Sequence, residues 1–150
     1  MPLKDLIQNL VSPANLVTIN AALGTIETTL AGKTVNLTPT ERQQYGSINE
    51  QNKLLVNKVN DYHVAQPQFN APQVVWTEFE SDLAIRISYD QLINRLNSLL
   101  EQLIDTKTLH DNDNYQQSLT QYSYISYLSE QNVPGTTSIK EDLAQFFPNS

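Results

Sequence analysis

The segment 77–109 constrains the fold more than any other part of the chain, because apolar residues recur along it every three or four positions. Neither proline nor glycine lies within it. Its apolar residues are Phe79, Leu83, Ile87, Leu92, Ile93, Leu96, Leu99, Leu100, Leu103 and Ile104. This spacing places them along one face of an α-helix. The sequence therefore predicts one long amphipathic helix, whose apolar stripe is expected to be covered by amphipathic segments in the flanking parts of the chain.

Shorter segments before this helix have the same periodicity. Residues 3–10 predict a short amphipathic helix, and Ser12 followed by Pro13 is typical of the N-cap and first turn of a second helix. This second helix ends before Gly32, which suits a left-handed C-terminal cap. Gly24 lies inside it, and we expect its missing side chain to let another helix approach closely.

A capping box predicts the start of a third helix. Thr38 can accept a hydrogen bond from the Glu41 amide while the Glu41 carboxylate accepts one from the Thr38 amide, and Pro39 suits the first turn. The apolar pattern continues until the helix must end before Pro67. The connector 66–75 is longer than most bundle loops but contains apolar residues, so we expect an ordered crossover.

The C-terminal part of the chain predicts two more helices. The polar run 111–114 is expected to break the long helix and to cap the next one, whose stripe extends to Leu128. A last short helix is expected at about residues 138–147, closed by Pro148. No segment alternates as a strand would. We therefore predict an all-α fold, a mainly antiparallel bundle of about four principal helices with short terminal helices.

Length and charge narrow the classes of protein to which this chain can belong. A chain of 150 residues suits one domain, here residues 1–150. Its net charge of −7 and its 9 scattered basic residues argue against nucleic acid or a membrane as partner. The absence of cysteine removes disulfides, thiolate chemistry and cysteine zinc sites. Gln8 and Asn9 interrupt the first apolar run, so we expect neither a signal peptide nor a membrane span, and hence a cytoplasmic protein.

A set of residues from the middle and the end of the chain resembles a family of short, uncharacterised bacterial proteins. The set is Leu37, Thr38, Pro39, Thr40, Glu41, Arg42, Gly46, Pro67, Phe79, Asp82, Asp105, Thr106, Tyr115, Tyr122, Val133, Pro134, Gly135, Glu141, Asp142, Leu143, Phe147 and Pro148. The likeness covers about residues 37–148 and implies an all-helical domain. The family has no assigned activity, so the resemblance implies no catalytic residue. The chain departs from the family pattern at Asp111, where glycine is expected, and in its heavy use of Asn and Gln.

The sequence predicts no metal site, no cofactor and no catalytic residue. A di-iron bundle needs a Glu three residues before each ligating His, and neither His63 nor His110 has one. A calcium loop starting at Asp111 would need glycine where Gln116 stands and an acid where Tyr122 stands. With two histidines and no cysteine, a catalytic triad would need an unmarked serine.

Local roles account for the histidines and for the carboxylates near residue 80. His63 lies near the C-terminus of the third predicted helix, where a protonated imidazole would meet the negative end of the helix dipole at the surface, and His110 is interpreted in the same way. Glu78, Glu80 and Asp82 are interpreted as a charged first helical turn, which is a simpler account than acid–base chemistry.

Tyrosine is concentrated late in the chain, and this gives a candidate interaction surface. Tyr122, Tyr124 and Tyr127 span much of the circumference of one predicted helix, so some of them must be exposed. Exposed tyrosine is favoured at protein interfaces, which makes Tyr124 and Tyr127 the candidate contact residues. Ordinary packing of these tyrosines against the last helix is an equal alternative.

These observations favour a non-catalytic interaction or assembly module that binds a protein partner or itself. The alternative is a small-molecule-binding protein or enzyme with a pocket between helices, using Asp82, Asp105 or Tyr122 as polar groups. A third hypothesis, a regulatory protein that neutralises a basic partner, fits the acidity but has no motif.

Overall fold

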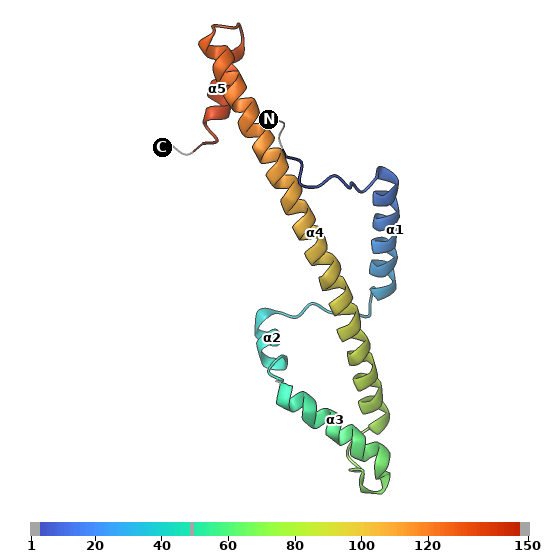
Figure 1. Cartoon of the computed structure of the whole chain (residues 1–150). Helices are drawn as coiled ribbons and strands as arrows, with labels where there is room; N and C mark the ends of the chain where they lie inside the picture. Colours follow the sequence, from blue (N-terminus) through green and yellow to red (C-terminus); the bar gives the residue numbers. More distant parts are fainter. Residues whose placement is uncertain (1–3, 49, 148–150) are drawn as a thin grey trace. The chain divides into compact units, whose positions relative to one another are not determined.

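The computed structural model describes residues 4–48 and 50–147 of the chain, and every regular element in these ranges is a helix (Figure 1). The elements in chain order are α1 (Pro13–Leu30), α2 (Pro39–Tyr45), α3 (Glu50–Ala65), the 3₁₀ helix η1 (Pro67–Phe69), α4 (Trp76–Glu130) and α5 (Thr136–Ala144). The all-helical prediction is confirmed.

The chain divides into two compact units. One combines residues 1–10 with 95–150 and holds the second part of α4 together with α5. The other spans residues 11–94 and holds α1, α2, α3, η1 and the first part of α4. Whether these units fold as a single domain stays a prediction.

The long helix is longer than the sequence predicts. α4 has 55 residues and passes through the polar run 111–114 without a break, so the predicted break is wrong. Asn and Asp each cost a helix less than about 0.7 kcal/mol relative to Ala, and no proline or glycine is present to stop it. Lys107 Nζ lies 2.5 Å from Asp111 Oδ2 one turn later, a pair that supports the helix at this point.

The predicted helix at residues 3–10 is absent from the described residues 4–10. The Asp5 carboxylate accepts a hydrogen bond from the Ile7 amide at 3.3 Å, a local turn that competes with helix formation. The Leu6 amide donates instead to Asp113 Oδ2 on α4 at 2.9 Å. The Leu6 amide therefore donates to a residue distant in sequence and is not available for a hydrogen bond within a helix. Leu3 lies outside the described residues.

The predicted start of α1 is confirmed in detail. Ser12 caps the helix, Pro13 occupies its first turn, and Asn15 completes a capping box that the sequence analysis did not anticipate. Gly32 after the helix has a φ of 75°, as expected of a left-handed cap. Outside its own turn of helix, no described atom lies within 4 Å of the place that a Gly24 side chain would occupy, so the predicted close approach of another helix is not present.

The third predicted helix is two helices. Its capping box is present, with Thr38 accepting from the Glu41 amide and Glu41 accepting from the Thr38 amide. The Glu41 carboxylate accepts hydrogen bonds from both the Thr38 amide and the Thr38 hydroxyl. These two bonds, the amide bond most of all, lower the pKa of the Glu41 carboxyl. The chain leaves helical geometry after Tyr45, where Gly46 is a poor helix former, and α3 begins at residue 50.

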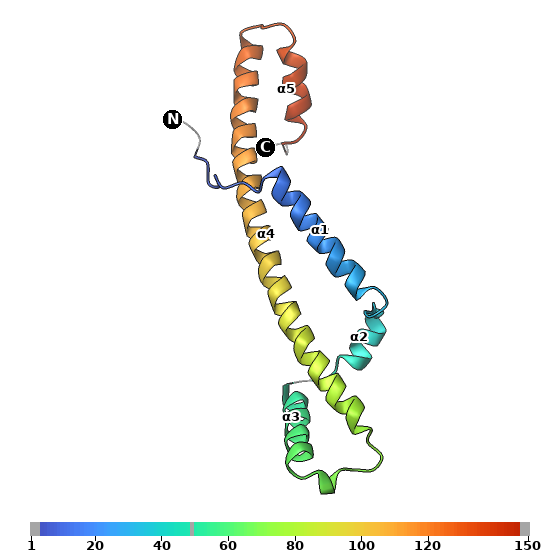
Figure 2. The ribbon, with the colours of Figure 1, turned by 90° about the vertical axis from the view of Figure 1, so that its right-hand side faces the viewer.

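The C-terminal end of α4 and α5 form a helical hairpin (Figure 2). The turn between them needs Gly135, whose φ of 86° lies in the left-handed region. α5 begins at Thr136 and ends at Ala144, earlier at both ends than predicted, and Pro148 lies outside the described residues. Tyr122 stacks on Phe147 with ring centroids 4.7 Å apart. Ile125 is the one buried apolar side chain in the described part of the chain.

Candidate functional site

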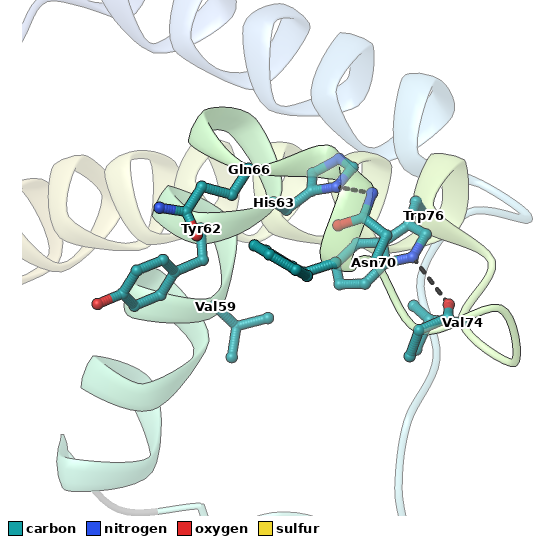
Figure 3. Close-up of a pocket in the computed structure, with 9 residues that line it drawn as sticks. Val59, Tyr62, His63, Gln66, Asn70, Val74 and Trp76 are labelled. Atoms are coloured by element: carbon teal, nitrogen blue, oxygen red, sulfur yellow. Dashed lines mark hydrogen bonds between the residues drawn. The ribbon is translucent and has the colours of Figure 1, made fainter.

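A hollow of about 400 Å³ lies where α3, η1 and the start of α4 meet (Figure 3). Its lining is mainly apolar and aromatic: Val59, Tyr62, His63, Gln66, Phe69, Asn70, Ala71, Val74 and Trp76. The connector 66–75 is ordered, as predicted, because η1 forms in it and because the Trp76 indole N–H donates to the Ala71 carbonyl at 3.1 Å. These contacts place the last turn of α3 beside the first turn of α4.

His63 is a polar side chain at this hollow that makes hydrogen bonds through both ring nitrogens and also stacks on an aromatic ring. Its Nε2 lies 2.6 Å from Glu80 Oε1, and its Nδ1 lies 2.8 Å from the Asn70 amide nitrogen. The imidazole stacks on the Trp76 indole with a centroid separation of 4.3 Å and an interplanar angle of 9°. Phe79 also contacts Trp76, in a T-shaped arrangement with ring centroids 5.3 Å apart. The His63 side chain is 11% exposed.

The surroundings of His63 favour its protonated form. The hydrogen bond to Glu80 raises the pKa of His63 above 6.5, and the Asn70 hydrogen bond adds to this effect, while desolvation opposes it. An amide can offer Nδ1 either its N–H or, after turning, its carbonyl oxygen, so Asn70 can serve both forms of the ring. A cationic ring also gains by lying over the face of Trp76.

His63 lies in the last turn of α3, near a helix C-terminus as predicted, but the surface role predicted for it is wrong because its side chain is only 11% exposed. Its ring faces Trp76, Asn70 and Glu80, none of which the sequence analysis connected with it. His63 and Glu80 are 17 positions apart, and only the path of the connector brings them together. The prediction that His110 caps a helix end is also wrong, because α4 continues to Glu130.

The polar residues expected in an inter-helix pocket do not line this hollow. Asp82 and Asp105 are exposed on α4, and Tyr122 packs on Phe147. Among the described residues, no group of three or more His, Asp or Glu side chains could hold a metal ion. No described helix is both long enough and apolar enough to cross a membrane.

The most extensive feature is the apolar stripe of α4. Every residue from 87 to 105 is exposed. The exposed large apolar residues of this segment are Ile87, Tyr89, Leu92, Ile93, Leu96, Leu99, Leu100, Leu103 and Ile104, and Leu99 is 57% exposed. Isolated exposed leucines are ordinary, but a continuous apolar face of this length is uncommon on a monomeric protein.

The two tyrosines of the predicted contact surface are also accessible. Tyr124 is 55% exposed and Tyr127 is 56% exposed, whereas Tyr122 of the same helix is half-buried against Phe147. Their role in binding stays a prediction.

Comparisons with models of protein families, with curated proteins and with solved structures found no match to this chain.

Proposed function

We propose that this chain is a non-catalytic interaction or assembly module, and that another chain supplies the helices that complete its bundle. The observation that carries the proposal is the exposed stripe of α4 over residues 87–105. Fully burying a Leu or Ile side chain contributes about 1.5–3 kcal/mol, and roughly half of that is still to be gained at each stripe residue. A stripe of this length can therefore stabilise a complex after the cost of association.

The bundle of four principal helices that the sequence predicts is part of this proposal. The apolar face of α4 supports it, because such a face packs against other helices in a bundle. Tyr124 and Tyr127 are proposed as additional contact residues, because exposed tyrosine adds apolar area and a hydroxyl at low entropic cost. Membership of a short helical bacterial family and a cytoplasmic location are proposed alongside it.

Native mass spectrometry of the protein isolated from its own host, at two concentrations, tests the proposal. We expect a dimer or a complex with another protein. Leu99→Glu, which places a charge on the stripe, should abolish the complex. Asn94→Glu, which adds the same charge on the opposite face of the same helix, should leave it intact. A monomer in all three proteins would contradict the proposal.

The hollow beside His63 favours a second candidate, a small-molecule-binding protein. Its volume of about 400 Å³ lies within the range of ligand pockets, and its lining is apolar with a few polar groups. A monomer that carries a reproducible small mass would support this candidate instead. Loss of that mass in Trp76→Ala would place the ligand in the hollow.

A further inference from the structure

The hollow beside His63 presents aromatic rings from three elements. Tyr62 of α3 is 58% exposed, and Phe69 of η1 is 77% exposed. Trp76, at the start of α4, lines the hollow as well and is half-buried (Figure 3). Stacking on an exposed aromatic ring adds to what a ligand gains from burying apolar area, and a flat ring stacks best. The hollow therefore suits a flat aromatic ligand.

The size and place of the hollow limit this ligand further. Its volume of about 400 Å³ is near the lower end of the range of ligand pockets, about 300–1,000 Å³, so the ligand is small. All of the residues that line it belong to the unit of residues 11–94. The site is thus formed within one unit.

The wall of the hollow offers no free charge to a ligand. Among the described residues that line it, Tyr62 and His63 are the ionisable ones. Both ring nitrogens of His63 are engaged, Nε2 with Glu80 and Nδ1 with Asn70. A charged group that entered this mainly apolar hollow would lose its hydration without gaining a counter-ion. We therefore expect an uncharged ligand.

Gln66 supplies a hydrogen-bonding group at the hollow. It is the N-cap residue of η1, but its side chain makes no capping hydrogen bond. Its side-chain amide has no hydrogen-bond partner among the described residues. A primary amide carries a carbonyl acceptor beside its N–H donors. It pairs with a ring edge that has a donor next to an acceptor, as glutamine does with adenine.

We propose that the hollow beside His63 binds a small, uncharged heteroaromatic molecule, which stacks on the exposed rings of Tyr62 and Phe69 and pairs a ring N–H and a neighbouring acceptor with the Gln66 amide. The inference rests on the second candidate for the function, a small-molecule-binding protein, and names the class of its ligand. It does not depend on what covers the stripe of α4.

Three probes of similar size separate the stacking from the hydrogen bonds. Carbostyril is a flat bicyclic lactam with an N–H beside its carbonyl, and coumarin has the same flat shape with an oxygen in place of the N–H. Fully saturated carbostyril keeps the lactam on a puckered ring system. Dissociation constants for the whole chain are measured by NMR, with the indole N–H of Trp76, the one tryptophan, as reporter. We expect carbostyril to bind about fivefold more tightly than either of the other probes.

Three variants locate the contacts. Gln66→Leu removes the amide and should abolish the preference for carbostyril over coumarin. Gln68→Leu, a matched change at a residue that does not line the hollow, should keep this preference. Phe69→Leu removes a ring that is mostly exposed, so the fold should be retained, and it should reduce the preference for carbostyril over its saturated form.

The outcomes separate this inference from the proposed function. No binding of any probe, equal affinity for all three, or a preference over coumarin that survives Gln66→Leu overturns the inference. A small mass in native mass spectra that Trp76→Ala removes would then still support the second candidate. A complex that Leu99→Glu abolishes, in a chain that binds none of the probes and carries no small mass, overturns the inference and its second candidate while supporting the interaction module.

Discussion

His63 joins α3 to α4 through its contacts with Glu80 and Trp76, so its charge affects the stability of the unit that contains residues 11–94. Because the folded state raises the pKa of His63, folding favours the protonated ring. The stabilising contribution is complete below the unfolded value of about 6.5 and is lost as the pH rises through the raised folded value. This unit should therefore be less stable at pH 8 than at pH 6.

We predict that NMR titration of the His63 ring gives a pKa above 6.5, and that Glu80→Gln lowers it. Trp76 is the one tryptophan of the chain, so its fluorescence reports thermal unfolding of this unit. The midpoint of unfolding should change less between pH 6 and pH 8 in Glu80→Gln than in the unaltered chain. Glu78→Gln is the control, since Glu78 lies in the first turn of α4, two residues before Glu80, whereas the carboxylate bonded to His63 is that of Glu80. A His63 pKa at or below 6.5 would contradict the role assigned to Glu80.

Residues whose partners are close in sequence were predictable. Ser12 and Thr38 cap their helices within three positions, so the chemistry of the cap can be read from the sequence. The His63 and Glu80 pair could not be read in this way, because it depends on the path of the connector. The hydrogen bond from the Leu6 amide to Asp113 could not be predicted from the sequence either, because it joins residues 107 positions apart.

At the scale of the helices, the continuity of α4 through residues 111–114 is the feature that differs most from the sequence prediction. If the chain had broken there, Asp111 would be an N-cap and the next position would suit proline. In a continuous helix, proline at position 112 removes a hydrogen bond and clashes with the preceding turn, at a cost of about 3 kcal/mol. The two interpretations therefore predict opposite responses to one substitution.

We predict that Asn112→Pro raises amide hydrogen exchange on the order of 100-fold in the flanking turns of α4. Asn112→Ala should slow exchange slightly, because Ala is the better helix former. Hydrogen exchange followed by NMR measures both. Unchanged exchange in the proline variant would mean that the helix already breaks at this point.

The helix periodicity predicted the start of α4 within one residue and the position of its apolar stripe, but not its end at Glu130 or the exposure of the stripe's leucines, which were expected to be covered. It could not predict what covers them, because an apolar stripe specifies that it should be buried but not which chain does so. The same limit applies to the bundle, which was inferred from stripes alone.

At the scale of the whole molecule, the central claim is that another chain covers the stripe of α4. The chain contains no cysteine, so a single introduced cysteine is the only thiol that a maleimide can label. Leu99→Cys places this thiol on the stripe, and Asn94→Cys places it on the opposite face of the same helix.

The most direct measurement compares the rate of maleimide labelling of these two variants in cells of the native host with the rate in the purified, dilute chain. We predict that Cys at position 99 is labelled at least tenfold more slowly in the host than in the purified chain, while Cys at position 94 is labelled equally fast in both. Equal labelling at position 99 in the host and in the purified chain would show that no partner covers the stripe, and it would contradict the account.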